Sequence, residues 1–305
     1  MNALTFALLS GLCASISNFF FHKSSSDTGP KFNINTYVVF YYLVSFLLSL
    51  VICHQIWKVP PKAIVVVLGS IVGIFNVLLM VLISRALRCG PAGLTFTFQN
   101  VSSIFPGAIL FAIFGSDFGF SFSYLQLIGI VMVLIGLCIG TKNDAENPLS
   151  SPRKWLKYAL GCFCVQIIAL TIMQARSILF DSDTLYNFPS ALSITKVEDV
   201  WFMPAQFASS LVFQLVICAL HKTKPHPSEM IYGSMAGVTN AASTFCILLA
   251  TQWAFPAEKV ILFPCFAVST IVLCNMWANW IYKEKFNLLA NTTCGIGIVL
   301  GSPLF

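Results

Sequence analysis

The chain has 305 residues, of which 57% are hydrophobic and only 9% are charged, and its formal net charge is +6. Soluble domains carry roughly 25% charged residues, so this composition excludes a soluble globular domain and predicts an all-α, multi-pass membrane protein. The positive charge is expected to orient loops across the bilayer rather than to bind nucleic acid.

Apolar runs of span length follow one another along the whole chain. A membrane-crossing helix needs about 20 mostly apolar residues. Ten runs approach that length, at residues 3–21, 36–56, 63–87, 91–114, 122–141, 156–180, 200–220, 230–252, 258–281 and 287–304. They are continuous rather than alternating, which predicts helices and not strands. The first run lacks a basic segment and a cleavage site, so it is expected to be a retained helix rather than a signal peptide.

One short pattern occurs in the third span and again in the eighth. The text GSIVGIFN at 69–76 returns as GSMAGVTN at 233–240, and the register continues downstream of both copies. This predicts two five-helix repeats, at residues 1–141 and 156–305, joined by a polar linker at 142–155. Five is an odd number, so the second copy must enter the membrane from the opposite side, which makes the repeat inverted.

Each copy places two glycines and an asparagine on one helix face. They are Gly69, Gly73 and Asn76 in the first copy and Gly233, Gly237 and Asn240 in the second. Glycine lets another helix approach closely, so both faces are expected to form packed seams. Two interpretations of the asparagines stay open. Each amide either hydrogen-bonds a neighbouring helix or faces a central cavity shared by the two halves.

The fourth span carries a polar patch, Gln99, Asn100, Ser102 and Ser103, followed by Pro106. Amides at this depth need partners or water, and a proline removes one backbone hydrogen bond, so we expect a kinked helix that lines a cavity. Gln99, Asn100 and Ser103 are therefore candidate substrate-binding residues. The ninth span holds Pro264 near the position that corresponds to Pro106.

Four further candidates come from charged and aromatic side chains: Glu258, Lys259, Tyr41 and Trp253. Glu258 and Lys259 either bind charged ends of a substrate or form an interfacial pair. Tyr41 and Trp253 either anchor the chain at the membrane surface or stack on a ligand. The eleven cysteines lie mostly in apolar runs and lack metal-ligand spacing, so neither a metal site, a disulfide nor a cofactor is expected.

The ten spans and the repeated text resemble the drug/metabolite transporter superfamily, and the EamA-like branch most closely. The best motif matches are the paired glycines of spans three and eight and the segment entering span four, with Ala86, Gly90, Pro91 and Ala92. The resemblance implies an inverted-repeat carrier whose central cavity lies between the halves, with spans five and ten at the periphery. One feature departs from the family. Its members often have a Gly-Glu-basic turn before the fifth and tenth spans, whereas the turns here are GSDFGF and YKEKFN, and only the second has an acid beside a base.

The sequence thus favours a secondary transporter of a small organic metabolite, which is amino-acid-like, nucleoside-like or cofactor-like. A coupling proton or a counter-substrate is possible, and the protein is expected to be a monomer or homodimer in a cell membrane, with a bacterial inner membrane as the leading expectation. The alternative is a membrane-embedded enzyme, but the sequence contains no HExxH, GxSxG or P-loop motif, so the chain is not expected to be one.

Orientation stays open at this level. If the N-terminus is cytoplasmic, five basic residues lie on the cytoplasmic side and twelve on the other. This count favours both termini outside, whereas the family resemblance implies both termini inside.

Overall fold

The computed structural model of the chain describes residues 2–28, 34–90, 92–115, 123–142, 151–180, 194–221, 226–255, 258, 261–283 and 288–301. Helices and short turns account for these residues, with no strand among them. A continuous apolar run in a bilayer must satisfy its backbone groups within the same segment, which is the reason such text folds as helix. The prediction of an all-α membrane protein is confirmed.

Eight helical segments of the described chain are long and apolar enough to cross a membrane. They are built from α1 (Ala3–Thr28), α2 (Ile34–Ile52), α3 (Ala63–Leu87), α4 (Ala92–Val101) with η3 (Ser102–Ile104) and α5 (Phe105–Phe114), α7 (Pro152–Ala175) with η5 (Arg176–Phe180), η6 (Glu198–Trp201) with α9 (Phe202–His221), α10 (Pro227–Trp253) and α11 (Leu262–Tyr282). The apolar stretch is shorter in the two remaining helices, α6 (Tyr124–Lys142) and α12 (Leu288–Gly301).

Two helices extend well beyond their predicted apolar runs. α1 continues to Thr28, although its apolar run ends at 21. α7 begins at Pro152, inside the residues predicted as linker. Proline is favoured in the first helical turn because its missing N–H has no intrahelical partner there, so polar residues that read as linker start the helix instead. The linker residues 143–150 lie outside the described residues.

The fourth span is interrupted where the sequence predicts a kink. Its first half, α4, gives way to the 3-10 turn η3 and then to α5, in which Pro106 occupies the first turn. Side chains within α4 also bond to backbone carbonyls: Thr97 Oγ1 donates to Gly93 O at 2.8 Å and Asn100 Nδ2 donates to Phe96 O at 2.8 Å. Pro264 behaves differently, because it lies in the first turn of α11 and interrupts nothing.

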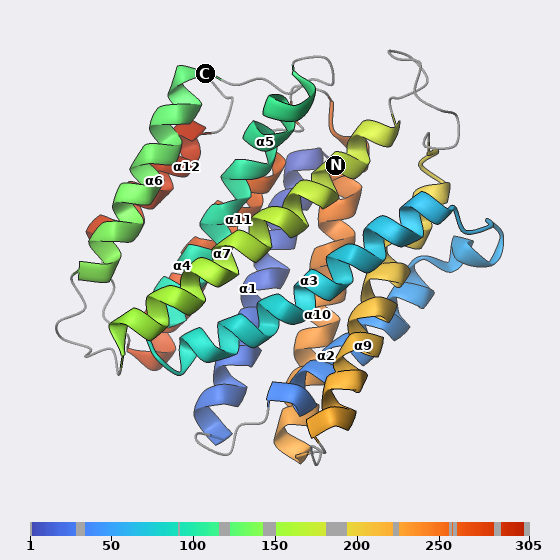
Figure 1. The fold of residues 1–305 in the computed structure, drawn as a ribbon, viewed down its shortest axis with the longest axis horizontal. Helices are drawn as coiled ribbons and strands as arrows, with labels where there is room; N and C mark the ends of the chain where they lie inside the picture. Colours follow the sequence, from blue (N-terminus) through green and yellow to red (C-terminus); the bar gives the residue numbers. More distant parts are fainter. Residues whose placement is uncertain are drawn as a thin grey trace.

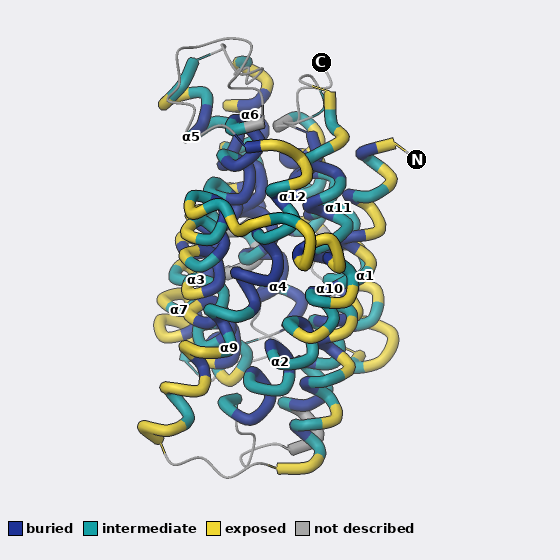
Figure 2. The backbone as a smooth tube through the Cα atoms, turned by 90° about the vertical axis from the view of Figure 1, so that its right-hand side faces the viewer, coloured by how far each residue is buried: buried dark blue, intermediate teal, exposed yellow. Residues whose placement is uncertain are grey.

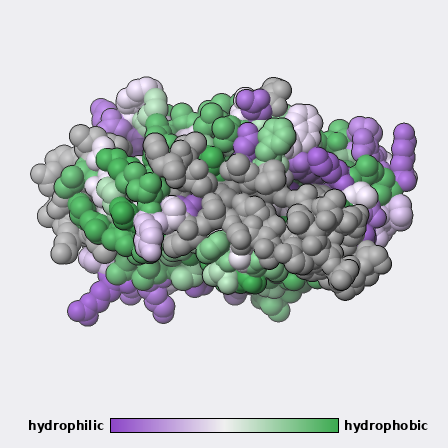
Figure 3. Space-filling view, turned by 90° about the horizontal axis from the view of Figure 1, so that it is seen from above, coloured by the Kyte–Doolittle hydropathy of each residue, from purple (hydrophilic) through white to green (hydrophobic). Residues whose placement is uncertain are grey.

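The helices form one bundle with two ends (Figure 1). One end, the terminal face, holds the beginnings of α1, α3, α9 and α11 and the ends of α2, α5, α7 and α10, and both chain termini lie on this side. The other end, the linker face, holds the end of α6 and the beginning of α7. The α4 helix runs through the middle of the bundle and is mostly buried (Figure 2). Viewed from above in Figure 3, hydrophobic side chains cover much of the described surface, with hydrophilic ones gathered at places around the rim.

Helix pairs repeat when the two halves of the chain are exchanged. α1 packs along α10, and α7 packs along α3. α2 packs on α10 as α9 packs on α3, and α1 packs on α11 as α7 packs on α4 and α5. The remaining large contacts, α2 with α9 and α6 with α12, each join one helix of the first half to its counterpart in the second.

The two predicted glycine seams are close helix contacts. A methyl group added to Gly69 would lie 2.6 Å from the carbonyl oxygen of Phe202 on α9, and one added to Gly233 would lie 2.5 Å from that of Tyr37 on α2. Added at Gly73, it would overlap the carbonyl oxygen of Gln206. The repeated text therefore packs α3 against α9 and α10 against α2, as expected for small residues at membrane helix interfaces.

Candidate functional site

A cavity of about 130 Å³ lies in the centre of the bundle. Residues from eight helices line it, four from each half of the chain: α1, α2, α3 and α4, and α7, α9, α10 and α11. Five of the residues predicted to bind substrate are among them: Tyr41, Asn76, Gln99, Asn100 and Asn240. Helices far apart in the sequence thus bring most of the predicted polar residues to one place.

Three amide oxygens at the cavity are buried and unpaired. Gln99 on α4, Gln166 on α7 and Gln206 on α9 each line the cavity, and none of their Oε1 atoms has a hydrogen-bond partner among the residues that the structure describes. A buried acceptor without a partner is costly, because it has lost its hydrogen bonds to water. The cavity therefore presents acceptors that a bound solute or water with donor groups would satisfy.

The asparagine of the second copy fulfils both interpretations that the sequence left open. Asn240 lines the cavity, and its Nδ2 donates a hydrogen bond to Ser45 Oγ of α2 at 3.2 Å. Ser45 Oγ in turn donates to Gly237 O at 2.9 Å, across the α10–α2 seam. The first copy has an equivalent seam bond, in which Ser210 Oγ of α9 donates to Gly73 O at 2.9 Å. The helix seam between α10 and α2 therefore lies directly beside the cavity, with Asn240 in contact with both.

Not all predicted site residues reach the cavity. Ser103 is buried on η3 but does not line the cavity, and no described residue forms a hydrogen bond with its Oγ. Trp253 lies at the terminal end of α10, where it packs edge-on against Phe6 with ring centroids 5.4 Å apart. Glu258 Oε2 accepts a hydrogen bond from Phe255 N at 3.1 Å, in a turn beyond that end. Lys259 lies outside the described residues, so its proposed partnership with Glu258 is not described.

Several cavity residues were not among the predicted site residues. Gln166 and Gln206 supply two of the three unpaired amide oxygens, and Asn18, Ser17 and Tyr42 also line the cavity. Gln206 and Asn18 satisfy the criterion that selected Gln99, since each is an amide inside an apolar span. Applied uniformly to every span, the same sequence signal would have found them.

A buried ion pair lies away from the cavity, at the terminal face. Arg176 Nη1 donates to Asp199 Oδ2 at 2.7 Å, and neither side chain is more than 1% exposed. Arg176 Nη2 also donates to Thr251 Oγ1 at 2.7 Å, and Gln252 Nε2 donates to Asp199 Oδ2 at 2.5 Å. The guanidinium lies 4.6 Å from the ring centroid of Phe202. This terminal cluster joins the ends of α7 and α10 to the beginning of α9.

A second hollow of about 230 Å³ adjoins the terminal cluster. Asp199 lines it, and the Oδ1 atom of Asp199 has no partner among the described residues. Cys53, Lys196 and Gln252 also line it. Burial, and then the nearby negative charge of Asp199, raises the pKa of the Cys53 thiol to about 11. The thiol is therefore almost entirely protonated near neutral pH, which slows its alkylation.

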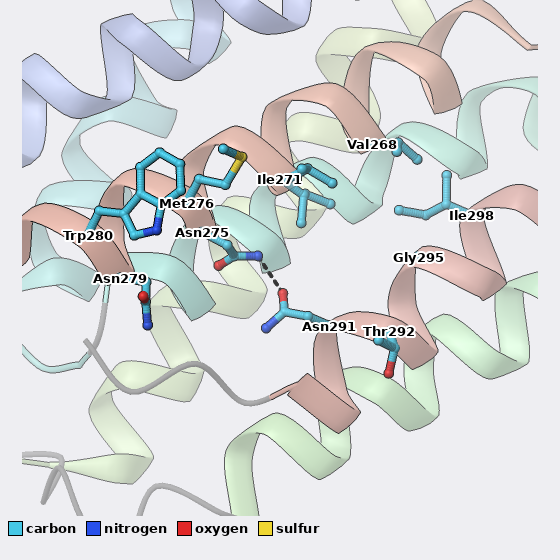
Figure 4. Close-up of a pocket in the computed structure, with 11 residues that line it drawn as sticks. Val268, Ile271, Asn275, Met276, Asn279, Trp280, Asn291, Thr292, Gly295 and Ile298 are labelled. Atoms are coloured by element: carbon cyan, nitrogen blue, oxygen red, sulfur yellow. Dashed lines mark hydrogen bonds between the residues drawn. The ribbon is translucent and has the colours of Figure 1, made fainter. Parts of the chain in front are cut away.

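A third hollow lies at the outside of the bundle. It is a groove of about 470 Å³ between α11 and α12, and Figure 4 shows the amides of Asn275 and Asn291 turned toward each other across it.

No described group of three or more His, Cys, Asp or Glu could hold a metal ion. The ten cysteines whose side chains the structure describes are all free thiols.

Comparison with known proteins reveals a similarity of fold and nothing more specific. No family model matches this chain, and no curated protein matches it. Among 26 similar chains of solved structures, one described only as "Crystal structure of protein" has a TM-score of 0.59 and 12% sequence identity. The match covers 97% of this chain and 94% of that one. The chain therefore shares its overall fold, over nearly its whole length, with a protein of known structure.

Proposed function

We propose that this chain is a secondary transporter that carries a small organic metabolite through the central cavity by alternating access. One observation carries the proposal: both halves of the chain contribute polar side chains to one cavity at the middle of the bundle, and three of its amide oxygens lack partners within the described part of the chain. Carriers built from inverted repeats hold their substrate near the bilayer midplane, at the interface of the repeats. The central position and the amide lining of this cavity support the proposal.

The same proposal includes ten spans arranged as two inverted five-helix repeats. The exchange of helix pairs between the halves supports it, since α1 on α10 mirrors α7 on α3 and α2 on α10 mirrors α9 on α3. The equivalent seam bonds from Ser45 to Gly237 and from Ser210 to Gly73 support it at the level of single atoms. In this plan, α6 and α12 complete the repeats as the fifth and tenth spans.

Membership of the drug/metabolite transporter superfamily is part of the proposal. It rests on the motifs quoted above, on a cavity between the halves, and on the peripheral position of the α6–α12 pair at one edge of the bundle (Figure 1). The similarity of fold to a solved protein at 12% identity does not indicate which substrate this chain binds.

The chemistry of the cavity narrows the substrate class. Its polar lining consists of amides and hydroxyls, and none of its lining residues is charged. A strongly charged solute would lose its hydration there without gaining an opposite charge. The volume of about 130 Å³ is below the roughly 300–1,000 Å³ of drug-sized sites. We therefore favour a small neutral or zwitterionic metabolite, such as an amino acid or a nucleobase, over nucleotide sugars.

The terminal cluster is proposed to hold the terminal face closed. Arg176, Asp199 and Gln252 come from the ends of three helices that surround the cavity, and opening between them must separate at least one of these hydrogen bonds. Substrate binding would have to offset that cost before the terminal face opens.

A thiol test separates this closure from other roles. In a chain that retains Cys53 as its only cysteine, Arg176→Ala is expected to increase labelling of Cys53 by a membrane-impermeant maleimide added at the terminal face. Arg85→Ala, at the other face, is the control. Equal labelling of the two variants would contradict the closure and leave the transport proposal standing.

We infer the orientation of the chain in the membrane from the distribution of its charged side chains. Among the described side chains, the linker face carries seven basic residues, Lys23, Arg85, Arg88, Arg153, Lys154, Lys157 and Lys283, against one acid, Glu229. At the terminal face, Arg176 is neutralised by Asp199, and Lys62 lies 3.5 Å from Glu198. Basic residues concentrate in cytoplasmic loops, so we favour a cytoplasmic linker face with both termini outside.

Reconstitution tests the function directly. Purified protein in liposomes is expected to take up, or to exchange, at least one labelled member of a panel of amino acids, nucleobases and nucleosides. Gln99→Leu should abolish that uptake while the protein still inserts and elutes as one species, and Thr239→Val, on α10 away from the cavity, should transport normally. Uptake that is unchanged in Gln99→Leu would refute the cavity role, and conversion of a panel member into a product would indicate an enzyme instead.

A further inference from the structure

The groove between α11 and α12 is open toward the surroundings of the bundle. Exposed apolar side chains of α11 line it, among them Val272, Met276 and Trp280, which is 72% exposed. Its volume of about 470 Å³ exceeds that of the central cavity, about 130 Å³. Val268 and Ile298 lie at one end and Trp280 and Asn279 at the other (Figure 4). Both helices are proposed membrane spans, so the groove is at the depth of lipid.

The groove exists because α12 packs mainly against α6 and only weakly against α11. α12 packs along α6, where a methyl group added to Gly297 would lie 2.7 Å from Gly129 O. Across the groove, Asn275 Nδ2 of α11 donates to Asn291 Oδ1 of α12 at 2.6 Å. Beside this bond the helices diverge: a methyl group added to Gly295 would find no atom within 4 Å. The Asn275–Asn291 hydrogen bond thus fixes the two helices beside the groove, and Gly295 has no side chain to fill it.

Physical chemistry limits what fills this space. Apolar cavities stay dry, so water is excluded from most of the groove. An α-helix is about 10–12 Å wide, so a helix of a second copy could cover the opening but not enter it. A flexible hydrocarbon chain can enter, and it gains dispersion contacts with walls that otherwise have no partner atoms on one side.

The end of the groove nearest the linker face suggests the headgroup. Trp280 lies at this end, and indole rings favour the headgroup level of a bilayer. α11 ends at Tyr282, and Lys283 follows in the left-handed conformation with φ of 54°. The described charges of this face are predominantly basic, as given above, and such a surface attracts anionic lipid.

We propose that the groove between α11 and α12 binds one acyl chain of an anionic glycerophospholipid, whose phosphate lies at the linker face beside Lys283. The site is independent of the central cavity, since no residue lines both. It would hold whether or not the chain transports a metabolite.

Native mass spectrometry of the protein released from nanodiscs tests the site. The nanodiscs contain phosphatidylglycerol and phosphatidylcholine in equal amounts. A methyl group added at Gly295 meets no atom within 4 Å, so Gly295→Leu places its side chain in the groove, and it replaces a helical glycine with a better helix former. Ile296→Phe, on the adjacent lipid-exposed position outside the groove, is the matched control.

The wild type and Ile296→Phe are expected to retain one phosphatidylglycerol, and Gly295→Leu is expected to retain it at least tenfold less. Equal retention by Gly295→Leu would overturn the site. Equal retention of phosphatidylcholine by the wild type would overturn the anionic headgroup. A dimer that Gly295→Leu disrupts would show that a second copy covers the groove instead. Retention of lipid is measured without any transport assay, so this test and that of the transport proposal fail separately.

Discussion

The α3–α9 seam and the α10–α2 seam are built alike but end differently. In both, a glycine pair admits a carbonyl oxygen of the facing helix, and a serine hydroxyl donates across the contact at 2.9 Å. Asn240 then continues the second seam by its bond to Ser45, whereas Asn76 makes no side-chain hydrogen bond to a described residue. The terminal cluster lies where the beginning of α9, in the first seam, meets the end of α10, in the second, since Asp199 leads into α9 and accepts a hydrogen bond from Gln252. The same packing unit thus supports two different polar environments.

The largest expected effect comes from breaking what the seams share. Gly73→Leu and Gly237→Leu should each cost more than about 3 kcal/mol, because a new side chain would meet backbone that cannot move away without separating the helices. The measurement is the yield of monodisperse protein together with its thermal unfolding. Ile74→Phe and Val238→Phe are the controls, since both positions are exposed on the same helices. A normal yield of either glycine variant would refute the close contact at that seam.

The next effect concerns the terminal cluster, which links one helix of each seam. Arg176→Ala leaves the Asp199 carboxylate buried without its charge partner, which should lower the free energy of unfolding by about 3–5 kcal/mol. The measurement is chemical or thermal unfolding in detergent. The double variant Arg176→Met, Asp199→Leu should recover much of the loss, because an apolar pair leaves no buried charge. If the single variant is as stable as the wild type, the pair is not buried as described.

A third experiment separates the two asparagines. Asn76→Leu and Asn240→Leu should each reduce transport by more than tenfold, because both amides line the cavity. Only Asn240→Leu should also lose stability, by about 0.6 kcal/mol, the average for a hydrogen bond between membrane helices. Transport rates and unfolding midpoints of the same preparations give both quantities. Equal loss of stability in the two variants would mean that the seams do not differ at their asparagines.

The smallest effect concerns the seam serines. Ser210→Ala should cost about 0.6 kcal/mol by removing its bond to Gly73 O. Ser45→Ala should cost more, because it removes the bond to Gly237 O and also leaves Asn240 Nδ2 without its acceptor. Unfolding midpoints measured side by side make the comparison. The reverse order would indicate that Asn240 finds another acceptor.

The sequence alone predicts the helical membrane fold, eight spans that the structure bears out in length and hydropathy, the two glycine faces and five residues that line the cavity. These follow from local properties. Hydropathy over one helix length decides what crosses a bilayer, and glycine spacing along one helix decides which face can pack closely.

Only the tertiary structure decides which polar residues meet. Asp199 lies between two predicted spans, yet it is buried against Arg176, and of the predicted site residues Asn100 reaches the cavity whereas Ser103 and Trp253 do not. No single-helix pattern contains this information. The rotation of each helix about its axis, and so the direction of every side chain, is set by packing against helices that are distant in the sequence.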